Sequence, residues 1–279
     1  MATLPPQQPL RFDGESHQAR DMAQSFGSDP ERYDRSRPSY PAALVERIIA
    51  ASPGREVLDV GCGTGIVGRQ FQAAGCSVLG VEPDARMAGQ ARQRGLEVEV
   101  TTFEDWDPAG RAFDAVVAGQ AWHWIDPVAG AAKAARALRN GGRLALFWNA
   151  FQPPPDLGEA FGAVFRQALP DSPAFGRSTR GAQAYGALAA KAAGAIRETG
   201  MFGDPEQWEF EWDRPYTRDE WLEQVPTSGF APRIQPDTMQ QILAGIGAAI
   251  DAAGGGFTAH YTTVTVTAAR AGTAAPGRP

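Results

Sequence analysis

The chain has 279 residues, 43% of them hydrophobic and 21% charged, which is enough for one large α/β domain, or one domain with an inserted cap, around a sizeable core. Its formal net charge of −6 disfavours a nucleic-acid-binding protein, which usually presents a basic face. No apolar run reaches the roughly 18 residues of a membrane span, and two cysteines without a secretory signal predict a cytoplasmic protein with no disulfide framework.

An N-terminal arm occupies residues 1–40. After a proline-rich start that we expect to be disordered, residues 15–26 could form a short helix. Asp29 is placed to cap a second helix that begins at Pro30, because proline suits the first helical position. Residues 41–51 then show apolar side chains at helical spacing, which predicts an amphipathic helix at the start of the main domain.

A glycine-rich turn follows a short apolar strand at residues 57–60. The turn reads Gly61-Cys62-Gly63-Thr64-Gly65, and a helical pattern begins directly after it, over residues 66–74. A strand, a glycine turn and a helix N-terminus together bring backbone N–H groups close to a nucleotide-like ligand. A Cβ atom at the crowded positions would keep such a ligand out.

The glycines allow more than one interpretation. Gly63 to Gly68 also fits the G-x-G-x-x-G dinucleotide pattern, which is a weak signal when it stands alone. Asp59, near the end of the strand, would repel a pyrophosphate but attract a ligand that carries an ammonium and a sulfonium group. The first glycine of the dinucleotide pattern should also end the strand, but here it would be Gly63, four residues after Asp59, which is late. A purely structural glycine turn is the third alternative.

The string VLDVGCGTG at residues 57–65 resembles the first motif of the class I S-adenosylmethionine-dependent methyltransferases, in particular the methyltransferase type 11-like group that acts on small molecules. This resemblance implies a Rossmann-like, doubly wound α/β fold with a mostly parallel seven-stranded sheet, an antiparallel last strand and a helical lid. It implies S-adenosylmethionine as cofactor, with S-adenosylhomocysteine as product. The cofactor-binding residues that it implies here are Asp59, Gly61, Cys62, Gly63, Thr64 and Gly65.

The second strand, predicted at residues 77–82, ends in an acidic residue. Glu82 lies 17 residues after Gly65, where a carboxylate accepts hydrogen bonds from the two ribose hydroxyls. The methyltransferase and dinucleotide interpretations both predict this residue; a solvated strand-end carboxylate is the alternative. Pro83 begins the next helix and is assigned with Glu82 to the cofactor site, and Met87 would lie near the adenine, or would serve only as core packing.

The arm also resembles the family. Residues 33–41 match the Y-D-x-x-R-P-x-Y-P stretch found before the first strand in many small-molecule methyltransferases. The resemblance implies that Tyr33 and Arg37 reach the methionine carboxylate of the cofactor, and arginine suits that task because it can bind a carboxylate with two hydrogen bonds. The alternative is a surface arginine beside a packed tyrosine.

An acidic loop follows the third strand, which we predict at residues 96–100. In the family that the chain resembles, a carboxylate here accepts from the adenine amino group and the preceding residue offers its backbone N–H. That implies Glu104 with Phe103 before it, and Asp105 as the second choice. An acidic loop near a helix start, without a ligand, is the alternative.

The fourth strand, predicted at residues 113–118, leads into residues 119–126, which resemble the Q-A-x-H-W version of the family's fourth motif. Ligands of open α/β sheets bind beyond the carboxyl ends of the strands, so this loop should lie at the reaction face. His123 is either a general base, since its ordinary pKa is about 6.5, or a residue that closes the cofactor pocket. The resemblance adds Gln120, Ala121 and Trp122 to the cofactor site.

The remaining elements complete the sheet and a substrate side. We predict a helix from Asp126 to Asn140 that stops at Gly141-Gly142, and a fifth strand over residues 143–148. The other predictions are helices at 156–169, 179–199 and 236–253, strands at 205–213 and 257–270, and a short helix with a capping box between Thr217 and Glu220. Phe151, Phe161, Phe165, Phe175 and Tyr185 are candidates for the substrate pocket.

The predicted organisation has five parts: the arm over 1–40, a cofactor-binding core over 41–150, a helical lid over 151–204, closing strands and helices over 205–270, and a disordered tail over 271–279. The leading hypothesis is a methyltransferase that acts on a small-molecule metabolite at O, N or C, with a role in secondary metabolism. A nicotinamide-dependent oxidoreductase, and a binding protein without turnover, remain as alternatives. We expect no metal, nucleic-acid or membrane partner, and a monomer or homodimer.

Overall fold

The structure is a computed structural model that describes residues 26–170, 181–229 and 231–272. The helix expected over residues 15–26, Phe175 and most of the predicted tail lie outside the described residues. Among the helices that are described, none is both long enough and apolar enough to span a bilayer.

A seven-stranded mixed sheet forms the centre of the molecule, with the strand order β3-β2-β1-β4-β5-β7-β6. The first five strands are parallel to one another, and β7 runs antiparallel to both of its neighbours, β5 and β6. This is the Rossmann-like, mostly parallel sheet that was predicted. The strand bounds are β1 Glu56–Val60, β2 Ser77–Val81, β3 Glu97–Glu99, β4 Phe113–Gly119, β5 Leu138–Gln152, β6 Glu206–Thr217 and β7 Gly256–Ala269.

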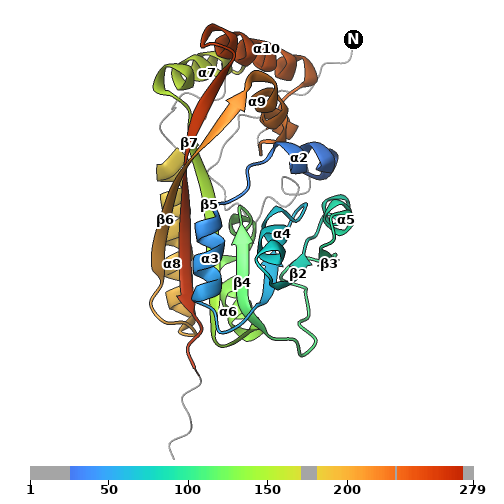
Figure 1. The fold of residues 1–279 in the computed structure, drawn as a ribbon, viewed down its shortest axis with the longest axis vertical. Helices are drawn as coiled ribbons and strands as arrows, with labels where there is room; N and C mark the ends of the chain where they lie inside the picture. Colours follow the sequence, from blue (N-terminus) through green and yellow to red (C-terminus); the bar gives the residue numbers. More distant parts are fainter. Residues whose placement is uncertain (1–25, 171–180, 230, 273–279) are drawn as a thin grey trace, which may run out of the picture.

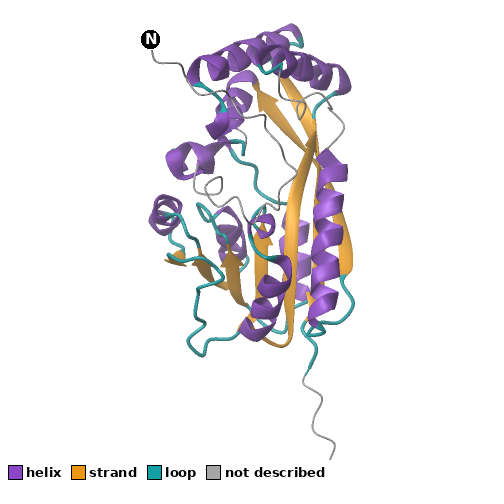
Figure 2. Cartoon of the chain, turned by 180° about the vertical axis from the view of Figure 1, so that it is seen from behind, coloured by secondary structure: helices purple, strands orange, loops and turns teal. Residues whose placement is uncertain are grey.

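Helices cover both faces of the sheet, as the doubly wound pattern requires (Figures 1 and 2). One face carries α3, α4 and α5, whose apolar residues share a buried cluster with alternate residues of β1, β2 and β4. The opposite face carries α6 and α8, which form a second cluster with the intervening residues of the same strands. The bounds are α3 Ala42–Ala50, α4 Ile66–Ala73, α5 Ala85–Gln93, α6 Pro127–Ala137 and α8 Gly181–Thr199.

A cap lies beyond the carboxyl ends of the parallel strands. It consists of α7 Pro155–Ala168, α9 Arg218–Gln224 and α10 Pro236–Ala252, packed on the far ends of β5, β6 and β7 (Figure 1). Strand β6 alternates as predicted, with Trp208 buried and Glu209 and Glu211 exposed. The capping box between Thr217 and Glu220 is also confirmed.

Strand β5 is longer at both ends than predicted. Helix α6 ends at Ala137 and not at Asn140, because Gly141 and Gly142 exchange backbone hydrogen bonds with Arg270 at the end of β7. At the other end, residues 149–152 continue to pair with β7 and do not break the sheet. The segment predicted as one lid, 151–204, divides between two places: α7 packs on α10 in the cap, and α8 packs on the sheet.

The arm helix α2, Pro30–Ser36, connects the core to the cap. Asp29 caps it as predicted, accepting the backbone N–H of Arg32. On the core side, the nearly buried Asp34 carboxylate binds Arg69 of α4 at 2.7 Å. On the cap side, Arg35 pairs with Glu223 of α9, and both side chains are largely exposed. The Asp34 carboxylate also lies 3.6 Å from Arg94 of the core, so the helix is held from both sides, by partly buried ion pairs on one and an exposed ion pair on the other.

We predict that Asp34→Ala will lower the free energy of unfolding by about 2 kcal/mol, because it removes the carboxylate partner of Arg69 in a partly desolvated place and leaves that side chain only its hydrogen bond to the Thr64 carbonyl. Arg35→Ala is the matched control on the next residue of the same helix, and it should lower the free energy of unfolding clearly less because its ion pair is solvent-exposed. Urea denaturation of both variants measures the difference. Equal losses would contradict this account of how the arm is held.

Candidate functional site

The predicted site lies at the carboxyl ends of β1 and β4. Strand β1 has β2 on one side and β4 on the other, so the chain reverses its direction of winding here, and open α/β sheets bind ligands at such a point. The turn after β1 and the loop after β4 touch: a Cβ atom built on Gly61 would lie 2.5 Å from the Cβ of Ala121. Only glycine fits at this position.

The glycine turn is anchored to the neighbouring strand. Gly61 and Cys62 both donate their backbone N–H to the carbonyl of Val81, at 2.8 and 3.2 Å. Gly61, Gly63 and Gly65 all have positive φ, at 65°, 56° and 84°, which side chains rarely tolerate. The Cys62 side chain is buried under Gly80 of β2, so Cys62 can present only its backbone to a ligand.

Glu82 lies beside this turn, as predicted. Its two carboxylate oxygens accept the backbone N–H groups of Gly63 and Asp84, each at 2.9 Å. Burial nevertheless raises the pKa of Glu82 to about 7, since two amide donors only partly replace water. Met87 is buried next to Gly63, whereas Pro83 is exposed. The structure thus brings Glu82, Gly63 and Met87 together.

Asp59 is the second buried carboxyl group of the site. It is 1% exposed and faces the first turns of α4, where the Gly68 backbone approaches it. Neither of its oxygens forms a hydrogen bond of ordinary geometry with any described residue. Burial therefore raises its pKa from 3.8 to about 7, although the Gly68 N–H lowers it, and the nearby Glu82 adds to the rise. A cationic ligand would oppose the pKa rise that burial and Glu82 cause, because it stabilises the charged carboxylate.

The loop after β3 is tied to α6. Phe103 is buried between Trp106 and Trp122, with ring centroids 6.1 and 6.2 Å away. The backbone carbonyl of Glu104 accepts Lys133 of α6 at 2.6 Å. The alternative acid, Asp105, accepts the Thr102 hydroxyl within its own turn, at 2.7 Å.

Gln120 adopts an unusual backbone conformation. Its φ is +55°, in the left-handed region that non-glycine residues rarely occupy and that often marks a functional site. Its backbone N–H donates to the Phe147 carbonyl at 2.9 Å, and its side-chain amide donates to the Asn149 carbonyl at 3.2 Å. Tyr185, from α8, hydrogen-bonds to the Gln120 side chain. The next residue but one, Trp122, is 2% exposed and packs against Phe103.

His123 is oriented by a tryptophan. Its Nδ1 accepts the Trp148 indole N–H at 3.3 Å, which places the proton of the neutral ring on Nε2. Desolvation by the surrounding protein lowers its pKa from 6.5 to about 4. Such a group is a poor general base near neutral pH, so of the two hypotheses for His123 the geometry favours the closing residue.

The predicted arm residues, Tyr33 and Arg37, lie between the core and the cap. The Arg37 guanidinium is 5.0 Å from the centre of the Tyr33 ring and donates from Nη2 to the Thr227 carbonyl of the cap at 2.5 Å. Its Nε is buried and has no hydrogen-bond partner among the described residues. Arg37 thus keeps a donor that an anionic group could use.

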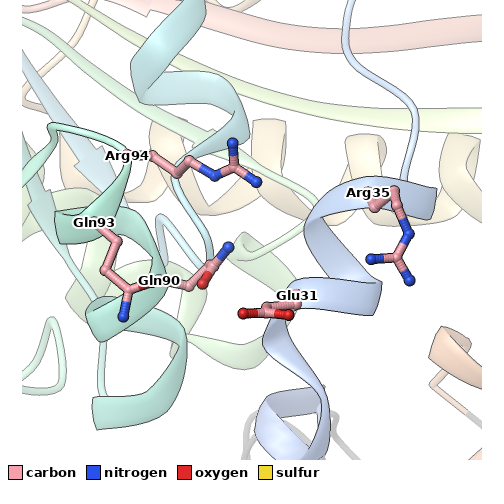
Figure 3. A pocket seen from close by; sticks show the side chains of 5 residues that line it. All are labelled: Glu31, Arg35, Gln90, Gln93 and Arg94. Atoms are coloured by element: carbon pink, nitrogen blue, oxygen red, sulfur yellow. The ribbon is translucent and has the colours of Figure 1, made fainter.

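Sequence reasoning missed the importance of Asn149, which lies directly after the fifth strand as we predicted it, residues 143–148. No local signal marks it, because its partners come from distant segments. A separate surface groove lies between α2 and α5, lined by Glu31, Arg35, Gln90, Gln93 and Arg94, and contains none of the predicted site residues (Figure 3). Within the described part of the chain, no three His, Cys, Asp or Glu side chains are grouped so that they could hold a metal ion.

Comparison with known proteins agrees with this geometry. Residues 57–142 match the family model described as "Methyltransferase domain". An uncharacterized methyltransferase of Mycobacterium tuberculosis is 39% identical over 132 residues, which are 47% of this chain and 54% of the relative. A malonyl-[acyl-carrier protein] O-methyltransferase of Enterobacter lignolyticus is 34% identical over 44% of this chain and 49% of the relative.

Two solved structures share the fold. A putative type II methyltransferase from Anaeromyxobacter dehalogenans superposes with a TM-score of 0.59 at 21% identity, over 85% of this chain and 99% of its own. A phosphoethanolamine N-methyltransferase from Haemonchus contortus, in complex with S-adenosyl-L-methionine, gives a TM-score of 0.53 at 16% identity, over 94% of this chain and 61% of its own. The chain spans about half the length of the curated relatives that it matches.

We predict that Asp59→Asn will change stability in a pH-dependent way. Because folding raises the pKa of Asp59 from 3.8 to about 7, the folded state binds the proton more tightly, and stability is lost as the pH rises through about 7. A full shift of this size corresponds to roughly 4 kcal/mol. Asparagine does not ionise, so the variant should gain stability relative to the natural protein as the pH rises from about 4 to about 7, and keep that gain at higher pH, measured by urea denaturation. A difference that is constant with pH would contradict the buried-carboxyl interpretation.

Proposed function

We propose that this chain, whose residues 57–142 match a methyltransferase-domain model, binds S-adenosylmethionine and transfers its methyl group to a small-molecule acceptor. One observation carries the proposal: two buried carboxyl groups, Asp59 and Glu82, flank a glycine turn at the point where the sheet reverses its winding. A ligand that is cationic at one end and carries ribose hydroxyls at the other fits this pair.

The residues present fit that cofactor. Each Glu82 oxygen accepts one backbone N–H and keeps lone-pair capacity for a ribose hydroxyl. The unpaired Asp59 carboxylate gives the site a negative charge where an ammonium or sulfonium group would be stabilised. Arg37, with its free Nε, and Tyr33 suit the methionine carboxylate at the opposite side. A dinucleotide pyrophosphate would instead be repelled by Asp59.

The adenine side follows from the same geometry. Met87 lies beside Gly63, and Phe103 and Glu104 lie in the loop that Lys133 ties to α6. We assign the adenine to the space between these elements, with Glu104 as the acceptor for its amino group. The loop residues Gln120, Ala121 and Trp122 would then close the site on the β4 side, because Ala121 touches the glycine turn.

Methyl transfer requires the protein mainly to position the methyl donor and the acceptor. When bound, S-adenosylmethionine supplies a methyl group on a sulfonium centre that a nucleophile displaces in line. The chain's contribution is to hold the donor and the acceptor about 3 Å apart and to exclude water. His123 is neutral, with its proton on Nε2, so it can donate a hydrogen bond to a ligand more readily than it can remove a proton.

An aromatic wall on the cap side supports a small, partly apolar acceptor. Phe151 is 38% exposed, which is unusual for a large apolar side chain, and its ring lies 5.1 Å from Trp221 and 6.1 Å from Tyr261. It lies two residues beyond Asn149 on the same face of β5, a distance of about 7 Å along the strand. A ligand on this wall would therefore lie between the cofactor loop and the cap.

Other features favour a small acceptor over a nucleic acid. One relative, from Chromohalobacter salexigens, is a ribosomal RNA small subunit methyltransferase, 38% identical over 39% of this chain. This chain, however, has a net charge of −6, whereas proteins that bind RNA neutralise phosphates with a basic surface. A metabolite, methylated at O, N or C in secondary metabolism, remains our proposal for the acceptor.

We predict that the purified protein binds S-adenosylhomocysteine with a micromolar dissociation constant, measured by calorimetry. Glu82→Gln should lower this affinity at least about tenfold, because it removes the paired carboxylate acceptor for the ribose hydroxyls. Glu99→Gln is the matched control, because Glu99 ends the neighbouring strand β3 but is held by Arg111. It should change the affinity by less than about twofold. Binding of NADH without binding of S-adenosylhomocysteine would overturn the proposal in favour of the oxidoreductase alternative.

We also predict that the acceptor will be found among small molecules. Incubated with S-adenosylmethionine, the protein should release S-adenosylhomocysteine faster in the presence of a bacterial metabolite filtrate than in the presence of purified RNA. Phe151→Ala should slow that release at least about fivefold at limiting acceptor, because it removes part of the wall. The affinity of the Phe151→Ala variant for S-adenosylhomocysteine should stay unchanged. Release that depends on RNA and not on the filtrate would contradict the small-molecule assignment.

A further inference from the structure

Asn149 joins three distant segments of the chain. It is 6% exposed and lies where β5 leaves the parallel part of the sheet. Its Oδ1 accepts the Thr263 hydroxyl of β7 at 2.6 Å, and its Nδ2 donates to the Ser39 carbonyl of the arm at 3.2 Å. Its own backbone carbonyl accepts the Gln120 side-chain amide at 3.2 Å.

The direction of these hydrogen bonds follows from their chemistry. The Trp212 indole N–H can only donate, and it donates to the Thr263 Oγ1 at 2.9 Å. The proton of that hydroxyl is then available for the Asn149 Oδ1. This fixes the orientation of the amide, and its Nδ2 must face the Ser39 carbonyl. All three hydrogen bonds are therefore donated in the same direction, from β6 through β7 and β5 to the arm.

Two partners of Asn149, Ser39 in the arm and Gln120 in the loop after β4, belong to segments that carry proposed cofactor contacts. Ser39 lies between Arg37 and Tyr40, and the Tyr40 backbone is held by Gln70 of α4 through two hydrogen bonds, at 3.0 and 2.7 Å. Thus the arm enters the core in a position that α4 and Asn149 define together. At the other end, Gln120 has a strained backbone, which persists only where its surroundings hold it.

We infer that Asn149 is a positioning residue of the cofactor site: its amide sets the position of the arm segment that carries Arg37, and its carbonyl holds the Gln120 loop. This inference rests on the proposed function, because it takes S-adenosylhomocysteine as the ligand. It goes further in assigning a role to a residue that is not expected to touch that ligand. The simpler alternative is that Asn149 only contributes to stability, as many buried polar groups do.

Asn149→Asp separates the two possibilities because it keeps the shape of the side chain. The aspartate can still accept from Thr263, but its second oxygen, when ionised, faces the Ser39 carbonyl and repels it. When protonated, that oxygen donates a hydrogen bond as the amide does. The affinity of the variant for S-adenosylhomocysteine should therefore be at least about tenfold weaker than that of the natural protein near pH 8. The ratio of the two affinities should fall toward one as the pH is lowered and this carboxyl group takes up a proton.

Other titratable groups do not explain such a change. His260 of β7 pairs with Asp213 at the surface, on the opposite face of that strand from Thr263. The elements around Asn149 also carry Arg37 and Tyr40 in the arm, His123 in the loop after β4, Tyr185 on α8 and Tyr261 on β7. Burial raises the pKa of each of these three tyrosines, and desolvation lowers that of His123 to about 4, so none of these four groups titrates between about pH 6 and pH 8. Asp59 and Glu82 do titrate in this range, but they are present in both proteins, so their titration affects both affinities alike and does not change the ratio.

Two threonines supply a matched control. Thr263 and Thr265 lie on the same strand and the same face, and both are fully buried. Thr263 belongs to the network, whereas the Thr265 hydroxyl has no hydrogen-bond partner among the described residues. Thr263→Val should weaken S-adenosylhomocysteine binding at least about fivefold, and Thr265→Val should leave it within about twofold. This pair also tests the inference if Asn149→Asp fails to fold.

Hydrogen exchange of the ligand-free protein near pH 8 gives a readout that needs no ligand. Asn149→Asp should speed exchange of the Tyr40 N–H at least about tenfold relative to the natural protein. If the natural protein does not bind S-adenosylhomocysteine but this exchange is faster in the variant, the proposed function fails and the positioning role stands. An affinity ratio near one at pH 8, a ratio that does not change with pH, or equal losses in the two threonine variants would overturn the inference.

Discussion

Two carboxyl groups, those of Asp59 and Glu82, are withdrawn from water within one site, and the rest of the site depends on how the chain accommodates them. Burial raises both pKa values to about 7. Glu82 is partly compensated by two backbone N–H groups, one of them from the glycine turn. Asp59 is compensated less, because only the Gly68 N–H lowers its pKa and neither of its oxygens forms a hydrogen bond of ordinary geometry with any described residue. A folded protein keeps such a buried acid at a cost in stability, and ionisable groups with strongly shifted pKa values cluster at functional sites.

The antiparallel unit of β5, β7 and β6 builds two functional regions from one set of strands. Near the parallel strands, its residues complete the sheet and reach the Gln120 loop through Asn149. Farther along, the same strands extend into the cap (Figure 1), where aromatic residues of β6 and β7 join its buried cluster. Because the strands are continuous, the proposed cofactor side and the proposed acceptor side keep a fixed spacing. The arm helix α2 then connects core and cap from the outside, through Asp34 and Arg35.

Local patterns predicted most of the fold and several parts of the candidate site. The strand-turn-helix pattern around Gly61 placed the glycine turn, and the position of Glu82 at the end of the next strand placed it beside that turn, because parallel strands end at one edge of the sheet. The end of α6 was predicted three residues too late. A glycine pair is a common helix stop, but here Gly141 and Gly142 pair with Arg270, which is more than 120 residues away in the chain.

The sequence by itself determined the order of strands and helices, the class of the fold and the side chains available at the ends of β1, β2 and β4, because these follow from short-range periodicity and spacing. Only the tertiary structure decided how those side chains behave. The low pKa of His123 comes from its surroundings and its tautomer from Trp148, the strained conformation of Gln120 is held by Phe147 and Asn149, and Asn149 itself matters because Ser39 and Thr263 meet there. Each of these properties arises from groups brought together across long stretches of chain, whose burial and hydrogen bonding no local pattern records.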